Sequence, residues 1–166
     1  IAEQWHPTKN GTLSPSDVTN GSGKRVWWKC PEGSDHEWDA TIASRTGGGR
    51  GCPFCAGLYA SVTNSVRTFS DVLSEQWHPT KNGDLTPDDF TFGTKFKAWW
   101  LCPVAPDHVW DAAIASRASR GRGCRACDGK QVSVTNSLQI LFPQLSEEWH
   151  PTKNGDLKPT EFTKGS

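Results

Sequence analysis

Cysteine and histidine recur in this chain at one fixed spacing. The first set is Cys30, His36, Cys52 and Cys55, and the second set, 72 positions later, is Cys102, His108, Cys124 and Cys127. Three cysteines in a set cannot all pair as disulfides within it, whereas three thiolates and one imidazole make a complete tetrahedral ligand set for zinc. We therefore predict two structural Zn²⁺ ions per chain. Disulfides, buried free thiols and iron are alternatives that the spacing leaves open.

The composition favours small cores that a metal ion stabilises. Only 34% of the 166 residues are hydrophobic, and the mean hydropathy is −0.62. A module this small can draw much of its stability from zinc, which contributes about 10–16 kcal/mol in zinc-finger peptides. The sequence contains no apolar run long enough for a membrane span. Reduced thiols as metal ligands predict an intracellular, reducing compartment: the cytoplasm or nucleoid, or the nucleus in a eukaryote.

The ligand sets lie within a longer repeat. The phrase Trp-His-Pro-Thr-Lys-Asn-Gly stands at residues 5–11, 77–83 and 149–155, again 72 positions apart. This period predicts a first zinc module at 1–62, a second at 63–134 and the start of a third at 135–166. Because the third copy stops before its metal ligands, we expect the chain to be part of a longer protein.

The pattern within one repeat predicts a β-hairpin and short helices. Adjacent tryptophans in the strand Phe96–Cys102 must face opposite ways, with the second one beside the metal. Alternation from Trp38 to Arg45 predicts the returning strand, with Arg45 on its outer face. Residues 137–142 read as a short helix capped by Asn136, and a second helix follows. The predicted fold class is a tandem array of small zinc-stabilised α+β modules.

Several rare residues occur together in one order: Trp-His-Pro-x-x-Asn-Gly, Trp-Trp-x-Cys, His-x-Trp, Arg and Gly-Cys-x-x-Cys. In this order the chain resembles the zinc-ribbon or treble-clef zinc-finger repeats of bacterial and plant proteins. The resemblance implies treble-clef-like modules in tandem. Arrays of that family can stand beside restriction- or repair-endonuclease-like domains, which implies an attached or associated nuclease as a partner. The repetition is not strict: the second copy has Arg125 where the first has Pro53, and Leu101 where the first has Lys29.

Positive side chains gather near the second ligand set. Between Lys95 and Arg125 they exceed the negative ones by four, whereas the excess in the equivalent stretch of the first copy is one. Arginine and lysine on a glycine-rich loop suit contact with phosphate. The candidate nucleic-acid contacts are Arg45, Arg50, Lys95, Lys97, Arg117, Arg120 and Arg122. We expect an array that binds nucleic acid, with duplex DNA favoured, as the targeting part of a larger protein.

The same residues allow other interpretations. Arg45 could instead pair with Asp39 or cap carbonyls near the zinc site. The outward tryptophans Trp27 and Trp99 could stack on a base or sugar, but packing on the preceding helix is favoured. The histidine of each Trp-His-Pro phrase is read as structural. Zero net charge favours a protein-interaction scaffold with repeated docking surfaces as the alternative function. We expect no enzymatic activity and no small-molecule substrate, because four protein ligands leave zinc no open position. We also expect no membrane partner, because the sequence has no apolar run of membrane-spanning length.

Overall fold

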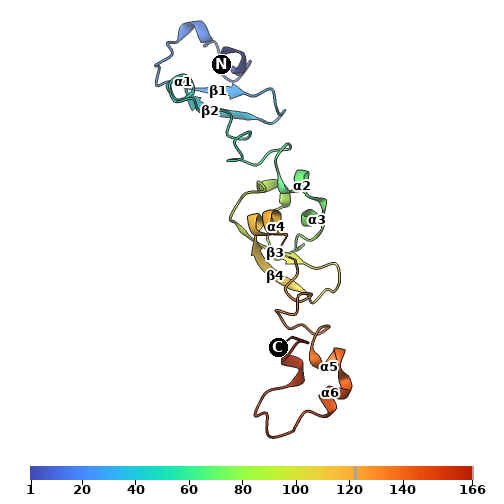
Figure 1. Ribbon diagram of the computed structural model, residues 1–166. Coiled ribbons are helices and arrows are strands. Elements are labelled where there is room, and N and C mark those ends of the chain that lie inside the picture. Colours follow the sequence, from blue (N-terminus) through green and yellow to red (C-terminus); the bar gives the residue numbers. More distant parts are fainter. Residues whose placement is uncertain (122, 166) are drawn as a thin grey trace. The chain divides into compact units, whose positions relative to one another are not determined.

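The computed structural model describes residues 1–121 and 123–165, and each complete repeat contains one antiparallel hairpin (Figure 1). The strands are β1 (Arg25–Lys29) with β2 (Glu37–Thr41) in the first module, and β3 (Lys97–Leu101) with β4 (Val109–Ala113) in the second. The α-helices are α1 (Ile42–Thr46), α2 (Val66–Phe69), α3 (Asp71–Glu75), α4 (Ile114–Arg120), α5 (Leu138–Leu141) and α6 (Pro143–Glu147). Short 3₁₀ helices are η1 (Ala2–Gln4), η2 (Pro15–Asp17), η3 (Pro87–Asp89) and η4 (Pro159–Glu161).

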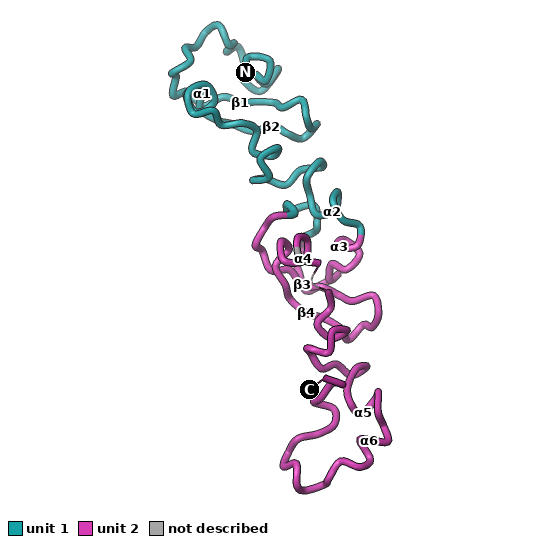
Figure 2. Tube along the Cα trace, viewed as in Figure 1, with its two compact units in different colours: residues 1–71, 86–92 teal, residues 72–85, 93–166 magenta. Residues whose placement is uncertain are grey.

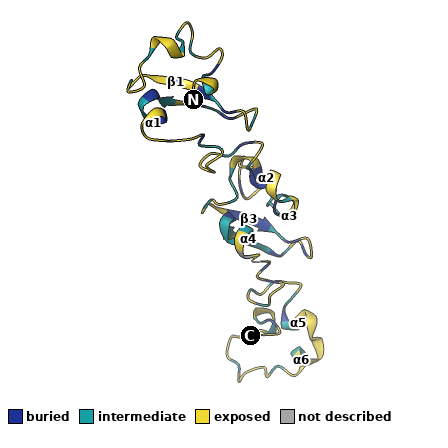
Figure 3. Ribbon diagram, turned by 45° about the horizontal axis from the view of Figure 1, so that its top comes forward, coloured by how far each residue is buried: buried dark blue, intermediate teal, exposed yellow. Residues whose placement is uncertain are grey.

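Tryptophan fills the inner face of each hairpin. Trp28 and Trp38 are cross-strand partners, and both are buried together with Val26 and Ile42. Trp100 and its partner on β4 repeat this arrangement. Figure 3 shows buried positions on the hairpins and the adjoining helices. The predicted facing of the second tryptophan and the first cysteine of each module is confirmed, because alternation along the strand buries both.

The returning strand is shorter than predicted. It ends at Thr41, and the chain then turns into α1, which begins at Ile42, where the sequence predicted continued extension as far as Arg45. Thr41 Oγ1 caps the helix by accepting a bond from the Ser44 amide at 3.3 Å. The apolar residues Trp38 and Ile42 are four apart, a spacing that fits a helix face as well as alternate positions of a strand. The prediction that Arg45 lies on an outer strand face is therefore wrong.

The Trp-His-Pro-Thr-Lys-Asn-Gly phrase forms a loop that closes on the first strand. His6 Nδ1 accepts bonds from the amides of Thr8 and Lys9 at 3.2 and 3.1 Å. The Asn10 side chain accepts from the Trp27 amide at 2.8 Å and donates to the Trp27 carbonyl at 3.0 Å. The equivalent histidines of the other two copies make the same pair of bonds. The structural interpretation of these histidines is confirmed.

The chain divides into two compact units, coloured separately in Figure 2. The first comprises residues 1–71 with 86–92, and the second comprises residues 72–85 with 93–166. In the first unit, the Val66 amide at the start of α2 donates to the Phe90 carbonyl at 2.8 Å. In the second unit, the Leu138 amide at the start of α5 donates to the Phe162 carbonyl at 2.7 Å. Each unit thus contains one zinc-ligand set and one helical turn paired with a later segment.

Candidate metal centres and the surfaces around them

The four predicted ligands of the first module converge. Cys30 follows β1, His36 precedes β2, and Cys52 and Cys55 lie in the loop after α1. Their ligand atoms all lie within 4.8 Å of one another. The Sγ atoms of Cys30 and Cys55 are 3.7 Å apart, and His36 Nδ1 lies 3.7 Å from Cys52 Sγ and 3.6 Å from Cys55 Sγ. The hairpin end and one loop therefore bring four soft ligands to a single point.

The second module repeats this geometry. The Sγ atoms of Cys102 and Cys127 are 3.6 Å apart. His108 Nδ1 lies 3.6 Å from Cys124 Sγ and 3.4 Å from Cys127 Sγ. As in the first module, the Nδ1 atom of the histidine faces the sulfurs. The predicted ligand sets are thus assembled in both repeats.

These separations fit a tetrahedral zinc ion. With Zn–S bonds of about 2.3 Å and Zn–N bonds of about 2.0–2.1 Å, a regular tetrahedron places two sulfurs about 3.8 Å apart and a sulfur and a nitrogen about 3.6 Å apart. All six cysteines are free. Sulfur atoms 3.7 Å apart are too distant for a disulfide, whose S–S bond is about 2.0 Å. Each set can hold one structural zinc ion.

Protons must leave the thiols when zinc binds, because the metal takes thiolates. Burial raises the pKa of Cys55 to about 12, and the neighbouring thiols of Cys30 and Cys52 act in the same direction. Burial likewise raises the pKa of Cys127 to about 12. Zinc uptake by either set therefore releases protons to the solvent.

A second layer of contacts orients the histidine ligands. His36 Nε2 lies 2.8 Å from Thr63 Oγ1 and 3.0 Å from Ser61 Oγ. His108 Nε2 lies 3.0 Å from Thr135 Oγ1. A hydrogen-bond partner on the distal nitrogen holds the ring in the tautomer and orientation that the metal needs. Both threonines belong to Ser-Val-Thr-Asn-Ser segments, at 61–65 and 133–137, that follow each Cys-x-x-Cys loop.

An asparagine ties each Ser-Val-Thr-Asn-Ser segment to the preceding zinc loop. Asn64 Nδ2 donates to the carbonyls of Phe54 and Tyr59 at 2.6 and 2.9 Å. Asn136 makes equivalent bonds, so the prediction that it caps the following helix is wrong: Ser137 occupies the N-cap position of α5. The Asn136 side chain instead donates its hydrogen bonds to backbone carbonyls of the preceding zinc loop.

Thr135→Val is expected to weaken zinc binding in the second module by about 10–100-fold, because valine removes the hydroxyl partner of His108 Nε2. Thr63→Val is expected to have a smaller effect, since Ser61 Oγ also lies within hydrogen-bond distance of His36. Competition with a chromophoric chelator, site by site, measures both affinities. Equal losses in the two variants would contradict the role assigned to Ser61.

Two predicted nucleic-acid contacts are buried instead. Arg45 is 6% exposed and Arg117 is 7% exposed. The Arg117 Cζ atom lies 4.5 Å from the ring centre of Trp100 and 5.0 Å from that of Trp110. Its Nη2 donates to Gln76 Oε1 at 2.6 Å. Because the chain turns into a helix after the second strand, both arginines point into the tryptophan core, and their predicted exposed position is wrong.

The charge of the metal site explains why an arginine is buried there. A zinc ion with three thiolates and a neutral histidine carries a net negative charge, which a nearby guanidinium balances at low dielectric. Burial lowers the pKa of Arg45, while the charges of Cys52 and Cys30 act to raise it. The same opposition acts on Arg117, with Cys124 and Cys102 as the thiols. The second-module core thus pairs one cation with one anionic metal site.

The remaining predicted contacts have different positions. Arg50, Lys95 and Lys97 are exposed. Arg120 ends α4, but its side chain, like the whole of Arg122, lies outside the described residues. Because Arg50, Lys95 and Lys97 are exposed, an anionic ligand can reach them.

A groove occurs at the same place in both modules, between the edge of the second strand and the Cys-x-x-Cys loop. Its volume is about 610 Å³ in the first module and about 600 Å³ in the second. Arg25 and Arg50 line the first groove, and Lys97, Arg125 and Lys130 line the second. The contacts predicted from the sequence did not include Arg25, Arg125 or Lys130. Arg125 was counted in the local positive charge and noted as a departure from repetition, and an extra cation beside a repeated loop was a usable signal for a contact.

Each groove has one exposed arginine that is not held by a carboxylate of the described residues. Arg25 pairs with Asp39 at 2.5 Å, Lys97 with Asp111 at 3.4 Å, and Lys130 with Asp128 at 3.7 Å. Among the described side chains, Arg50 and Arg125 have no carboxylate oxygen within 4.0 Å. These two guanidinium groups are the cations most available for an incoming anion.

The outward tryptophans remain at the surface. Trp27 is 38% exposed and Trp99 is 37% exposed, each with a lysine Nζ over its ring, so they do not pack on a helix in the way the sequence favoured. In the first module, Lys9 also pairs with Glu37 at 2.7 Å. Bonds from Lys9, Lys29 and His6 lower the pKa of Glu37 to about 2. Val109 stands at the equivalent position of the second module, which removes this anion.

The chain matches a family of known proteins. The family described as "Probable Treble clef zinc finger domain" matches residues 1–58 and again residues 73–130. No curated protein matches the chain. Among the described residues, no helix is long and apolar enough to cross a membrane. The two matched stretches contain the two ligand sets, one in each.

Proposed function

Because the chain belongs to the family described as probable treble clef zinc finger domains, we propose that it is a tandem array that binds nucleic acid through its two grooves. Zinc fingers of this kind serve nucleic-acid or protein binding. The observation that carries the choice of nucleic acid is the repeated groove with an unpaired arginine, Arg50 in one module and Arg125 in the other.

Phosphate contact suits these grooves. Guanidinium groups bind phosphate oxygens in a bidentate manner, and neutralising phosphates releases counterions from the nucleic acid. The zero net charge of the chain gives little attraction at long range, so binding depends on local contacts. Two weak grooves on one chain gain through effective concentration. Duplex DNA, whose phosphates form two continuous rows, is the favoured target.

The proposed role is binding rather than catalysis. Each candidate zinc ion has four protein ligands, which leaves no coordination position for a reactive water. Chemistry on the nucleic acid would come from an attached or associated nuclease, which the array would position.

Charge reversal in the grooves tests the proposal. Arg50→Glu with Arg125→Glu is expected to lower the slope of log affinity against log salt by about two, because each lost phosphate contact lowers it by about one. Fluorescence anisotropy with duplex and single-stranded DNA and RNA, at several salt concentrations, measures the slope. Lys153→Glu with Lys158→Glu is the control, since it makes the same change in net charge in the third copy of the repeat.

The outcomes separate the binding classes. If the unaltered, zinc-loaded chain binds none of these nucleic acids at low salt, the proposal is wrong. If the control pair lowers the slope as much as the groove pair, binding depends on total charge and the grooves are not the site. A lower slope for the groove pair alone supports the proposal.

A protein-interaction scaffold remains the second candidate because of one observation. The first groove is also lined by Leu58 and Tyr59, which are 73% and 57% exposed. Exposed apolar side chains at a groove suit a protein partner. Arg50→Glu would then affect partner binding less than Leu58→Asp.

A further inference from the structure

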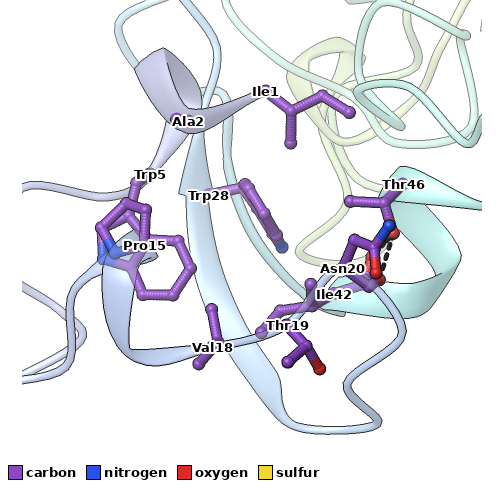
Figure 4. Close-up of a pocket in the computed structure, with 10 residues that line it drawn as sticks. All are labelled: Ile1, Ala2, Trp5, Pro15, Val18, Thr19, Asn20, Trp28, Ile42 and Thr46. Atoms are coloured by element: carbon purple, nitrogen blue, oxygen red, sulfur yellow. Dashed lines mark hydrogen bonds between the residues drawn. The ribbon is translucent and has the colours of Figure 1, made fainter.

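The first strand of each hairpin has one tryptophan on its inner face and one on its outer face. Trp28 is 1% exposed and lines, together with Trp5, a mostly apolar pocket of about 240 Å³ (Figure 4). Its neighbour Trp27 is 38% exposed, and Trp99, the equivalent residue of the second module, is 37% exposed. The core uses the inner rings, whereas a ligand can reach the outer ones.

The outer tryptophan of the second module adjoins the charged groove of that module. Lys97 lies two positions before Trp99 on β3, so both side chains are on the same face of the strand. Asp111, the cross-strand partner of Trp99, lines the groove together with Lys97. A nucleic acid whose phosphates lie in this groove can therefore place a base beside Trp99.

A lysine of the Trp-His-Pro-Thr-Lys-Asn-Gly loop lies over each outer ring. Lys81 Nζ is 4.4 Å from the ring centre of Trp99, and Lys9 Nζ is 4.5 Å from that of Trp27. In the second module the Asn82 side chain fixes the loop, because it accepts from the Trp99 amide at 2.8 Å and donates to the Trp99 carbonyl at 3.0 Å. A rigid backbone contact thus keeps a flexible cationic side chain beside the ring.

The two lysines differ in what else holds them. Lys9 pairs with Glu37 at 2.7 Å. The second module has Val109 at the position of Glu37, and within the described part of the chain no carboxylate oxygen lies within 4.0 Å of Lys81 Nζ. Lys81 is also exposed. It can therefore leave the ring of Trp99 without breaking an ion pair, and its ammonium group can then bind a phosphate.

We propose that Trp99 stacks on an unpaired base of a bound nucleic acid, while Lys81 binds the phosphate next to that base. This inference rests on the function proposed above and narrows the ligand to a nucleic acid with a single-stranded segment beside a duplex. Within a duplex both faces of a base are covered by its neighbours, so only an unpaired or terminal base can use the ring. Every base has a π-face, so the site selects for an unpaired base and not for a sequence.

The exchange of Lys81 for a base is favourable. Stacking of a base on an aromatic side chain contributes more than the contact of an exposed lysine with the ring. The displaced ammonium group gains a phosphate in return. In the first module the same exchange would also separate Lys9 from Glu37, so Trp27 is not a stacking site.

Two tailed duplexes test the proposal. One DNA duplex carries a single-stranded thymidine tail, and the other carries an abasic tail of the same length, so both present the same number of phosphates. Fluorescence anisotropy with the zinc-loaded chain is expected to show about tenfold tighter binding of the thymidine tail. Trp99→Leu should abolish this preference, whereas Trp99→Tyr, which keeps an aromatic ring, should retain most of it. Trp27→Leu is the matched control and should retain all of it.

Exchanging the residue beside the lysine gives a test that leaves both tryptophans in place. Val109→Glu introduces the carboxylate that holds the lysine in the first module, and it should reduce the preference for the thymidine tail. Glu37→Val releases Lys9 and should increase the preference, because it makes a second ring available. The zinc content of each variant shows whether its modules are folded.

The outcomes separate this inference from the proposed function. If the chain binds both tailed duplexes equally well, nucleic-acid binding stands and stacking on Trp99 is wrong. If it binds neither at low salt, both proposals are wrong. A preference lost equally in Trp27→Leu and Trp99→Leu would contradict the difference between the modules, and an undiminished preference in Val109→Glu would contradict the role of Lys81.

Discussion

Removal of zinc is expected to unfold both modules, with loss of the far-ultraviolet circular dichroism of the hairpins and a red shift of tryptophan emission. The hairpins have two strands each, and a two-stranded sheet is marginal in water without further support. The metal joins the hairpin end to the Cys-x-x-Cys loop. Structural zinc contributes about 10–16 kcal/mol in small fingers, more than the whole stability of many domains.

Single ligand substitutions show whether the two sites act separately. Cys30→Ser and Cys102→Ser are each expected to lower the zinc content, measured by mass spectrometry under native conditions, from two ions to one. Ser34→Ala is the matched control, because Ser34 is an exposed residue of the same loop as Cys30 and is not a ligand. Two bound ions in either serine variant would contradict the assigned ligand set.

Arg117→Ala is expected to cost about 2–5 kcal/mol of the free energy of unfolding of the second module, the range for truncating a large buried side chain. The change leaves a cavity between Trp100 and Trp110, removes the donor to Gln76, and leaves the anionic metal site without its nearby cation. Denaturant unfolding of the zinc-loaded protein, followed by tryptophan fluorescence, measures the loss.

Two further variants distinguish a core role from a role in phosphate contact. Lys97→Ala changes an exposed cation of the same module and should alter stability by about 0.5 kcal/mol or less. Arg117→Met keeps much of the side-chain volume without the charge and should fall between Arg117→Ala and the unaltered chain. If Arg117→Ala left stability unchanged but lowered the salt slope of DNA binding, Arg117 would be a surface contact after all.

The metal sites could be predicted from the sequence because zinc chemistry and internal repetition constrain the same residues. Three cysteines and one histidine recur with one spacing in both copies, and together they make a complete tetrahedral ligand set for zinc. The hairpin strands were also predictable, since alternating burial is visible in residues such as Trp27 and Trp28. The structural role of His6 followed from its place in a turn without a neighbouring cysteine.

Arg45 and Arg117 were misplaced because their local pattern is ambiguous. Apolar residues at Trp38 and Ile42 suit a strand face and a helix face equally. The cap is not a usable signal either, because Thr41 caps α1 with its side chain whereas Ala113 begins α4 without one. An arginine that balances a metal site cannot be distinguished by sequence from one that contacts phosphate. The grooves could not be predicted, because they arise where a strand edge packs beside a loop.

The Ser-Val-Thr-Asn-Ser segment has a consequence for protein engineering. A graft that ends at residue 62 would carry all four ligands of the first zinc ion into a new host, yet it would omit Thr63, whose hydroxyl supports His36. It would also omit Asn64, which fastens the zinc loop. A transplanted finger should therefore extend through Asn64 into the next module. The repeat boundary in the sequence, at residue 62, comes before the zinc site is complete.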